Sequence, residues 1–555
     1  MKKNIFLGFA LILILGFGTV WLLNHRTSDL SEELEISIEE DKPGFFSESP
    51  YWEEIQGFYR ERDFLEVWFF NQKLSDQGED FLEKLESIHL DGLQKEDYNW
   101  QDFQVFVSED KADQRRIKKL SEEKLSRLEL LMTHAFFTLA RDLEYGKVDP
   151  RGLDPNWKFE EKEGLFLYSD LLKEVADGES LEKTLAKLNP DLKLYADGRE
   201  AIRELYSIKE NDTLDWSEVT ISTAVKVGES HPKIPKIRER LIFWGFLSPY
   251  SINQPLTFDE KMEEGLKKYQ ASQGMEPDGV IGSLVVSQLN KSPQNLIDLA
   301  AANLERLRWL PRIDWDQELV LVNVANYQLD YLNKSDTLFS TKVIVGKDYS
   351  ESPSFTAPMS YIVFSPYWNV PPSITNEEII PAVKKDKSYL AQKNMELVNQ
   401  SGELVNVSSV KWEQVENGEF PYRIRQKPGG SNSLGLVKFM FPNPYNIYIH
   451  DTPNRGLFAK ETRALSHGCI RIQYPDKFAK ILLDDPEWTE EKIQEAMSQT
   501  NEQTVKLEKS IPVVLLYLTF WAEEDGKFNY RPDIYGRDEA LMRALKNKKS
   551  SLDQA

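Results

Sequence analysis

The sequence predicts an α+β protein of several domains, and three observations lead to this prediction. The chain has 555 residues, which is too long for a single hydrophobic core. Apolar residues recur at helical spacing from about residue 45 to residue 229. From residue 318 onward, short runs rich in Val, Ile, Phe and Tyr alternate with turn residues. We therefore expect helical domains first and a mainly β domain after them.

Composition narrows the class of protein further. The 91 Asp and Glu outnumber the 68 Lys and Arg, which gives a net charge of -23. Such a chain repels phosphate backbones, and no long block of basic residues offsets this, so no nucleic-acid partner is expected. The only cysteine is Cys469, which excludes intramolecular disulfides and cysteine-rich zinc modules.

An uncharged run at the start of the chain predicts a membrane anchor. Residues 5–23 follow Lys2 and Lys3 and have about the length that a helix needs to cross a bilayer. Basic residues in front favour a cytoplasmic N-terminus. The alternative is a cleaved signal peptide, but the bulky residues 20–23 stand where a cleavage site needs small ones. We expect a retained anchor within residues 1–26. Both interpretations imply that the remainder of the chain is exported from the cytoplasm.

The next two segments are expected to carry no chemistry. Residues 27–44 are rich in Ser and Glu, and this composition predicts a solvated acidic linker. Residues 45–232 predict a helical scaffold domain, in which Ser121 caps a long helix that ends near Gly146. We interpret the two histidines of this domain as packing residues; they are His89 and His134.

Residues 233–291 predict a compact module of three helices. Thr257 and Glu260 have the spacing of a capping box ahead of the second helix. A DGVIGS turn at 278–283 leads into the third. This order resembles the peptidoglycan-binding-1 module, and the alternative is a helical spacer without a binding groove.

The remaining chain holds the β domain. Residues 292–315 predict a connecting helix, residues 316–525 the β domain, and residues 526–555 a charged tail with a helix. A long excursion at about 371–433 interrupts the β domain. Insertions of this size commonly serve as lids or binding loops.

One stretch of the β domain carries the residue types of acyl transfer. His450 ends a predicted strand and Cys469 begins another, so adjacent strands can bring imidazole and thiol together. The imidazole can take the proton of the thiol and leave a thiolate nucleophile. Gly468 permits a tight turn that aims the N–H groups of Gly468 and Cys469 at one point, as in an oxyanion hole.

Other interpretations of this stretch remain open. Cys469 is alternatively a buried structural cysteine. His450, His467, Cys469 and Asp451 together offer the ligand types of a zinc site. The β domain is also compatible with a non-catalytic role in wall binding or scaffolding.

The pattern of a His followed by Ser466-His467-Gly468-Cys469 resembles the L,D-transpeptidases with a YkuD-type catalytic domain. Further blocks resemble the large, periplasmic, YcbB-like branch of that family. They include NLERLRWLP (303–311), YWNVPPSI (367–374) and RALSHGCIRI (463–472). The resemblance implies a β-sandwich or barrel, with the insertion as a capping subdomain. It also implies a single-pass protein of the inner membrane with its bulk in the periplasm.

The same resemblance implies a role for each residue of the motif. Cys469 is the nucleophile, His450 its general base, and His467 lines the site. Gly468 is expected to supply an oxyanion N–H alongside Cys469.

Two further residues keep open roles. Arg471 stands where the wider family often has Asn, and it either orients the site or binds a substrate carboxylate. Asp451 directly follows the base and is a candidate to orient His450, unless strand alternation turns it away.

The resemblance also implies the reaction and its partners. The partners are peptidoglycan stem tetrapeptides, as donor and as acceptor, and the product is a cross-link between their third residues. Water as acceptor gives L,D-carboxypeptidase activity instead, and attachment of a protein to the wall is another outcome of the same site. Carbapenem β-lactams are the expected acylating inhibitors, and we expect no cofactor and no metal.

Overall fold

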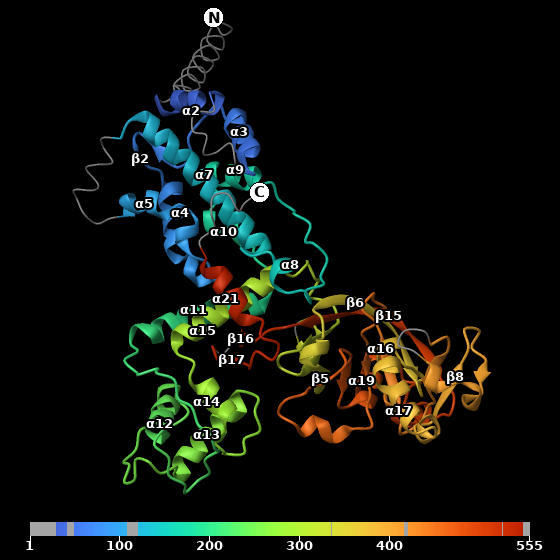
Figure 1. The fold of residues 1–555 in the computed structure, drawn as a ribbon. Helices are drawn as coiled ribbons and strands as arrows, with labels where there is room; N and C mark the ends of the chain where they lie inside the picture. Colours follow the sequence, from blue (N-terminus) through green and yellow to red (C-terminus); the bar gives the residue numbers. More distant parts are fainter. Residues whose placement is uncertain are drawn as a thin grey trace, which may run out of the picture.

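The computed structural model describes residues 29–40, 49–107, 120–334, 336–415, 420–523 and 526–547. Figure 1 shows the N-terminal helical region at one end and, at the other, a small helical module and a β domain. The predicted anchor at residues 5–23 lies outside the described residues. Within those ranges, no helix combines the length and the hydrophobicity required to span a bilayer.

The predicted acidic linker at 27–44 is wrong for its middle part, which forms helix α2 (Asp29–Glu39). Leu30, Leu34 and Ile38 recur every fourth residue and are at most 5% exposed. This stripe packs against helix α7 (Glu122–Tyr145). The acidic side chains dominate the composition, but the helical spacing of three apolar residues decides the structure.

Further helices and a small β-hairpin of the scaffold domain surround α7. They are β1 (Phe69–Phe70), β2 (Lys73–Leu74), α3 (Trp52–Glu61), α4 (Asp76–Ser87), η1 (Ile88–Asp91), η2 (Lys95–Asp97), α5 (Trp100–Val107), α8 (Pro150–Leu153), α9 (Tyr168–Ala176), α10 (Leu181–Ala186) and α11 (Lys193–Glu210). As predicted, α7 begins after Ser121 and ends before Gly146, although the Ser121 side chain makes no capping hydrogen bond. His134 is 9% exposed in this core, as expected of a packing residue.

The C-terminal end of α7 meets the connecting helix α15 (Pro293–Arg308). The N–H of Val148 donates to the Glu305 carboxylate at 2.7 Å. A side chain at Gly146, whose φ is +88°, would collide with Glu305 and Trp309. The scaffold is therefore joined closely to the helix that leads into the β domain.

The predicted three-helix module is present as α12 (Ile234–Phe243), α13 (Glu260–Ser272) and α14 (Ser283–Leu289). The cap of α13 differs from the prediction, because Asp259 rather than Thr257 accepts the Met262 N–H, at 3.0 Å. The Gln270 side chain accepts the Gly279 N–H at 2.9 Å and so holds the DGVIGS turn. The module contacts the C-terminal segment through the hydroxyls of Tyr269 and Tyr530, 2.9 Å apart.

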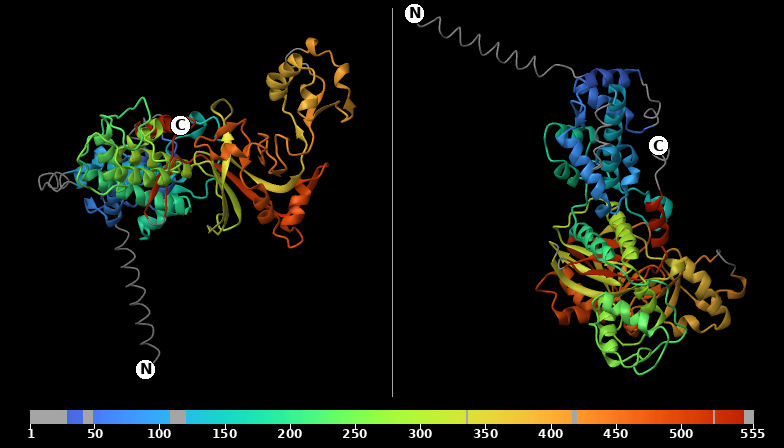
Figure 2. Two further views of the ribbon diagram at one scale, coloured as in Figure 1. Left: turned by 90° about the horizontal axis from the view of Figure 1, so that it is seen from below. Right: turned by 90° about the vertical axis from the view of Figure 1, so that its left-hand side faces the viewer.

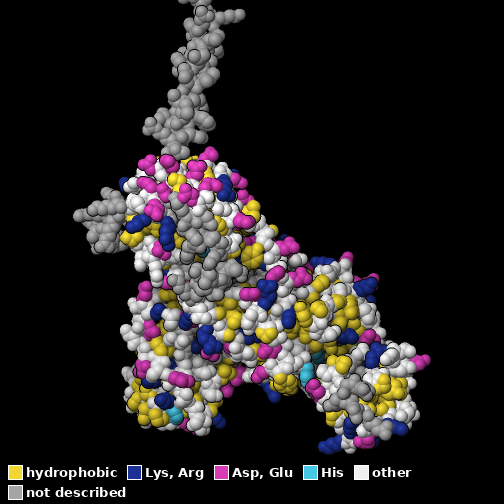
Figure 3. Space-filling model, turned by 45° about the horizontal axis from the view of Figure 1, so that its top comes forward, with side chains coloured by type: hydrophobic (Ala, Val, Ile, Leu, Met, Phe, Trp, Pro, Cys, Tyr) yellow, Lys and Arg dark blue, Asp and Glu magenta, His cyan; other side chains and the backbone are white. Residues whose placement is uncertain are grey.

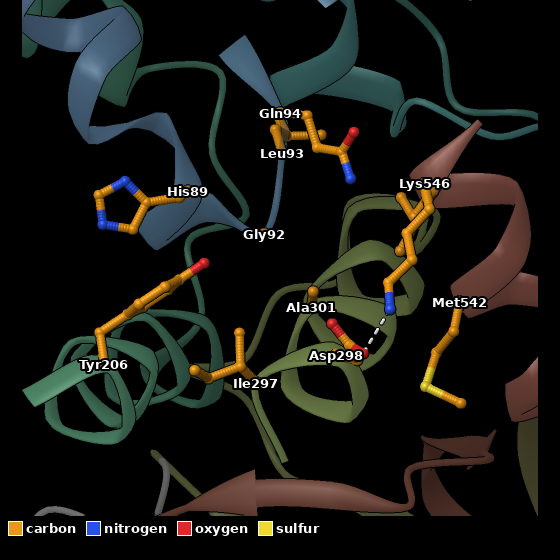
Figure 4. A pocket seen from close by; sticks show the side chains of 11 residues that line it. His89, Gly92, Leu93, Gln94, Tyr206, Ile297, Asp298, Ala301, Met542 and Lys546 are labelled. Atoms are coloured by element: carbon orange, nitrogen blue, oxygen red, sulfur yellow. Dashed lines mark hydrogen bonds and ion pairs between the residues drawn. The ribbon is translucent and has the colours of Figure 1, made fainter. Parts of the chain in front are cut away.

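The tail of the chain returns to the connecting helix. Strands β16 (Phe520–Ala522) and β17 (Phe528–Tyr530) lead to helix α21 (Asp538–Lys546). The predicted tail helix is thus confirmed, and its Leu541 and Leu545 are buried in a core with α11 and α15. Between η1, α11, α15 and α21 lies a cavity of about 70 Å³, lined by His89 and Tyr206 among others (Figure 4). It holds no cysteine and lies outside the β domain.

The β domain contains a nine-stranded sheet with the order β13-β5-β14-β12-β11-β6-β15-β3-β4. Its strands are β3 (Leu319–Asn323), β4 (Gln328–Asn333), β5 (Asp336–Gly346), β6 (Phe355–Phe364), β11 (Val437–Met440), β12 (Ile449–His450), β13 (Ala464–Ser466), β14 (Ile470–Ile472) and β15 (Gln503–Leu516). An additional β4–β5 pairing closes the sheet on itself. Helices α19 (Pro475–Leu483) and α20 (Glu490–Met497) follow β14 and pack on this domain.

The predicted insertion forms a subdomain with its own sheet and core. Its strands are β7 (Trp368–Asn369), β8 (Met395–Val398), β9 (Leu404–Val405) and β10 (Arg423–Gln426), and its helical turns are α16 (Pro372–Ile374), η4 (Thr375–Ile379), α17 (Ile380–Lys385) and α18 (Tyr389–Gln392). Val383, Leu397 and Trp412 lie in its core. Figure 2 shows the subdomain projecting from the edge of the β domain.

The surface in Figure 3 mixes acidic and basic side chains. No continuous basic area crosses this face. The view agrees with the net charge of -23.

Candidate active site

Two parallel neighbouring strands bring the predicted catalytic residues together. Strand β12 pairs with β14 in the register Ile449 with Ile470 and His450 with Arg471. Successive side chains of a strand point to opposite faces of the sheet. Ile449 and Ile470 are fully buried in the core, so His450 and Arg471 share the other face. Cys469 precedes β14 and lies on this same face.

The thiol of Cys469 is partly exposed and has polar neighbours. Its Sγ lies 3.7 Å from the Asn446 carbonyl oxygen, and the Tyr448 hydroxyl donates a hydrogen bond to it. Burial raises the pKa of the Cys469 thiol to about 11, against the opposing effects of Tyr448 and the Arg471 charge. At neutral pH the Cys469 side chain is therefore a protonated thiol, and a nucleophilic role would require a base.

His450 is suited to be that base. The side chain is buried, and its Nδ1 lies 2.5 Å from the Asp451 carbonyl oxygen. Burial, together with the charges of Arg471 and Lys438, lowers the pKa of His450 to about 3. The imidazole is therefore neutral at pH 7, and Nδ1–H donates to the carbonyl. This tautomer puts the lone pair on Nε2, and the backbone of Leu434 also contacts the ring.

The Asp451 carboxylate does not orient His450, so that interpretation is wrong. Strand alternation turns it to the opposite side, where it accepts the Leu436 N–H at 2.9 Å. It also pairs with Arg455 at 2.9 Å. Gly435 makes this arrangement possible, because a Cβ there would come within 2.3 Å of the carboxylate. Asp451 acts on His450 through its backbone carbonyl instead.

The turn before the nucleophile differs from the prediction in one hydrogen bond. Gly468 has a φ of +108°, as the tight turn requires. Its N–H, however, donates to Ser466 Oγ at 3.1 Å. Ser466 Oγ in turn donates to the Cys469 carbonyl at 2.7 Å. The Gly468 N–H is thus engaged within the turn, which leaves the Cys469 N–H as the candidate oxyanion donor of the predicted pair.

His467 lies beside the nucleophile but faces the inserted subdomain. Its Nε2 is 3.1 Å from Glu378 Oε1 on η4, and both side chains are well exposed. The turn at Gly468 interrupts strand alternation, so His467 does not share the face of Cys469. It connects the nucleophile turn to the insertion.

Arg471 faces the thiol and the imidazole. Burial lowers the pKa of its guanidinium, and the neighbouring Cys469 acts in the opposite direction. Among the hydrogen bonds of the described residues, none engages its buried Nε. A guanidinium with an unused donor beside the nucleophile is well placed to bind a carboxylate.

Sequence reasoning missed two residues on this face. Tyr448 is two residues before His450, just ahead of β12, and the two rings are 5.7 Å apart. Lys438 of β11 pairs with His450 across the sheet. Strand alternation would have found Tyr448, but Lys438 requires knowledge of the strand order.

The ligand types considered for a zinc site do not assemble into one cluster. Across the described ranges, no group of three or more His, Cys, Asp or Glu side chains has the arrangement of a metal site.

The β domain matches a known family of catalytic domains. Residues 317–493 match the family model described as the L,D-transpeptidase catalytic domain of the YkuD type. Residues 53–202 match a scaffold domain, and residues 230–289 match a domain described as "Putative peptidoglycan binding domain".

A curated relative and two solved structures resemble the chain in part. A Haemophilus influenzae protein named "Putative L,D-transpeptidase" is 36% identical over 247 residues, which cover 44% of this chain and 49% of the relative. The chain thus matches about half the length of this relative. Crystal structures of L,D-transpeptidases from Xylanimonas cellulosilytica and Stackebrandtia nassauensis align over 54% of this chain and 100% and 97% of theirs. Their identities are 13% and 12%, with TM-scores of 0.17 and 0.20.

Proposed function

We propose that the chain is a cysteine-dependent L,D-transpeptidase that cross-links the third residues of peptidoglycan stem peptides. The observation that carries this proposal is the shared face of β12 and β14. This face supports the proposal because His450, a neutral imidazole whose Nδ1 is fixed by the Asp451 carbonyl, is on the strand that neighbours the one following Cys469, the only thiol in the sequence.

The first half-reaction forms a thioester. His450 Nε2 takes the thiol proton as Cys469 Sγ attacks the carbonyl carbon of the third stem residue. The resulting oxyanion is stabilised by the Cys469 N–H. When the C–N bond to the terminal D-alanine breaks, the imidazolium returns its proton to the leaving amine. Arg471 is suited to hold a donor carboxylate during this step.

The second half-reaction releases the thioester to an amine. The side-chain amine of another stem's third residue attacks the acyl carbon, the C–S bond breaks, and His450 carries the proton of the amine to the leaving sulfur. Water in place of the amine gives L,D-carboxypeptidase activity, and a protein amine gives attachment of that protein to the wall. A non-catalytic wall-binding protein is the alternative from a different class.

The insertion is proposed to act as a cap over the donor site. The contact between Glu378 of η4 and His467 supports this role, because it brings the subdomain to within two residues of the nucleophile. The contact uses exposed polar side chains, so it is compatible with movement when substrate enters.

Defined muropeptides provide the direct test of the proposed reaction. A mixture of tetrapeptide donor and acceptor is expected to give a dimer whose mass equals the sum of the two peptides minus one free D-alanine. Product analysis by mass spectrometry separates this dimer from the tripeptide that hydrolysis would give. Unchanged tetrapeptides, with the protein folded, would favour the non-catalytic alternative.

The helical module at 233–291 is proposed to hold the enzyme on peptidoglycan. Deleting it is expected to weaken retention on isolated sacculi while turnover of small muropeptides persists, since the proposed chemistry is assigned to residues of the β domain. A pull-down with sacculi measures the retention. Equal retention of both proteins would favour the spacer interpretation.

We also propose that residues 5–23 anchor the chain in the inner membrane, with the catalytic domain in the periplasm. The uncharged run after Lys2 and Lys3 motivates this proposal. The native protein should then remain in the membrane fraction after a high-salt wash. N-terminal sequencing that begins beyond residue 23 would contradict it.

A further inference from the structure

The loop between β5 and β6, residues 347–354, lies directly beneath the nucleophile turn. It folds back tightly at its start, since a Cβ on Gly346 would come within 2.1 Å of the Ser350 carbonyl oxygen. It also touches the turn, because the Lys347 N–H donates to the Ser466 carbonyl at 3.0 Å. We call residues 347–354 the bracing loop.

Ser352 connects the bracing loop to the peptide before the nucleophile. Its side chain is completely buried. Its Oγ accepts the Gly346 N–H at 3.0 Å and donates to the Gly468 carbonyl oxygen at 2.7 Å. The hydroxyl is thereby fixed in position, and it determines where the Gly468 carbonyl points.

The direction of that carbonyl determines the direction of the oxyanion donor. The Gly468 C=O and the Cys469 N–H belong to one planar trans peptide, in which the two groups point in opposite directions. Holding the carbonyl toward the bracing loop therefore turns the Cys469 N–H away from it. We propose that Ser352 is a positioning residue that aims the Cys469 N–H at the oxyanion formed during acyl transfer. This inference rests on the proposed function, because an oxyanion forms only if Cys469 attacks a carbonyl.

The C-terminal part of the chain, at Tyr535, also contacts the bracing loop. The Tyr535 hydroxyl donates to the Gly346 carbonyl at 2.7 Å and accepts the Ser352 N–H at 3.3 Å. Tyr535 is thus bonded to both ends of the stretch that positions the Ser352 hydroxyl.

The scaffold contributes to the same support. Arg537 forms ion pairs with Glu351 of the bracing loop and, at 3.1 Å, with Asp154 of the scaffold. Arg537 and Asp154 are at most 10% exposed, so water screens this pair weakly. Asn156 donates to the Glu351 carboxylate at 2.8 Å. The bracing loop is therefore fastened to two segments that lie far from it in sequence.

Two reactions of the Cys469 thiol distinguish an incorrectly oriented oxyanion donor from a less reactive sulfur. Acylation by a carbapenem opens the lactam, with a C–S bond formed, a C–N bond broken and an oxyanion in between. Alkylation by iodoacetamide displaces iodide and forms no oxyanion. Ser352→Ala in the full chain is expected to slow acylation by about 10- to 100-fold, somewhat less than the 10²–10³ typical of a deleted oxyanion donor. Its alkylation rate should stay within about twofold of wild type, because the base and the thiol are untouched.

Ser354 supplies a matched control in the same loop. It is also fully buried, but its Oγ has no hydrogen-bond partner among the described residues. Ser354→Ala should leave both rates unchanged. Tyr535→Phe should slow acylation by a smaller factor than Ser352→Ala and leave alkylation unchanged, and it provides a second test if Ser352→Ala does not fold.

The outcomes are distinct. Selective loss of acylation in the Ser352 or Tyr535 variant supports the inference. Unchanged acylation, or an equal slowing of both reactions, would overturn it. A wild-type thiol that is alkylated but never acylated would instead overturn the proposed function, and this inference with it.

Discussion

Replacing Cys469 by Ala is expected to abolish cross-linking of muropeptides. No second thiol exists to replace it, and the proposed nucleophile is lost. The intact mass of wild type should rise by one drug equivalent after exposure to a carbapenem, and that of Cys469→Ala should not. Cys469→Ala retains the whole surrounding sheet, so its thermal unfolding should remain close to that of wild type.

EDTA distinguishes the thiol mechanism from the zinc interpretation. Both acylation and turnover should be unaffected by the chelator. Activity that disappears with EDTA and returns with Zn²⁺ would contradict the assignment, and so would an adduct that forms equally well without Cys469.

Replacing His450 by Ala is expected to slow acylation at pH 7 by about 10²–10⁴, as for a lost general base. In wild type the pKa of His450 is lowered to about 3, so the base stays neutral and active throughout the range from pH 5 to 8. The variant must rely on thiolate that forms without assistance. The pKa of the thiol is raised to about 11. At any pH below 11, the thiolate fraction therefore increases about tenfold for each unit by which the pH rises.

The ratio of wild-type to variant rate should therefore shrink as the pH rises. Stopped-flow measurement of carbapenem acylation between pH 6 and pH 10 tests this dependence. His467→Ala is the matched control, because it removes the other nearby imidazole while leaving His450 in place. If His467→Ala were the slower of the two variants, the roles of the two histidines would have to be exchanged.

Much of the architecture follows from periodicity in the sequence. The long helix α7, the three-helix module and the change to short β-type runs all come from local spacing of apolar residues. The same reasoning predicts that the strands carrying His450 and following Cys469 are neighbours, and β12 and β14 do pair. The linker at 27–44 shows the limit of composition, since its charges concealed three apolar residues at helical spacing.

What could not be predicted depends on contacts between distant segments. The Gly468 N–H was assigned to the oxyanion, but a side chain two residues earlier, Ser466, satisfies it. Lys438, Ser352 and Tyr535 reach the site only through the order of strands and the return of the C-terminal segment. No local pattern marks such residues, because their partners lie elsewhere in the chain.

The length of α7 has a consequence for where the enzyme can work. Its 24 residues extend about 36 Å at 1.5 Å per residue, with α2 packed along it and α15 attached at its C-terminal end. With the N-terminal segment held in a membrane, as proposed above, this helix would contribute a rigid length of about 36 Å to the part of the protein between the membrane and the β domain. Under the proposed function, the scaffold would then contribute to the distance from the bilayer at which cross-links form.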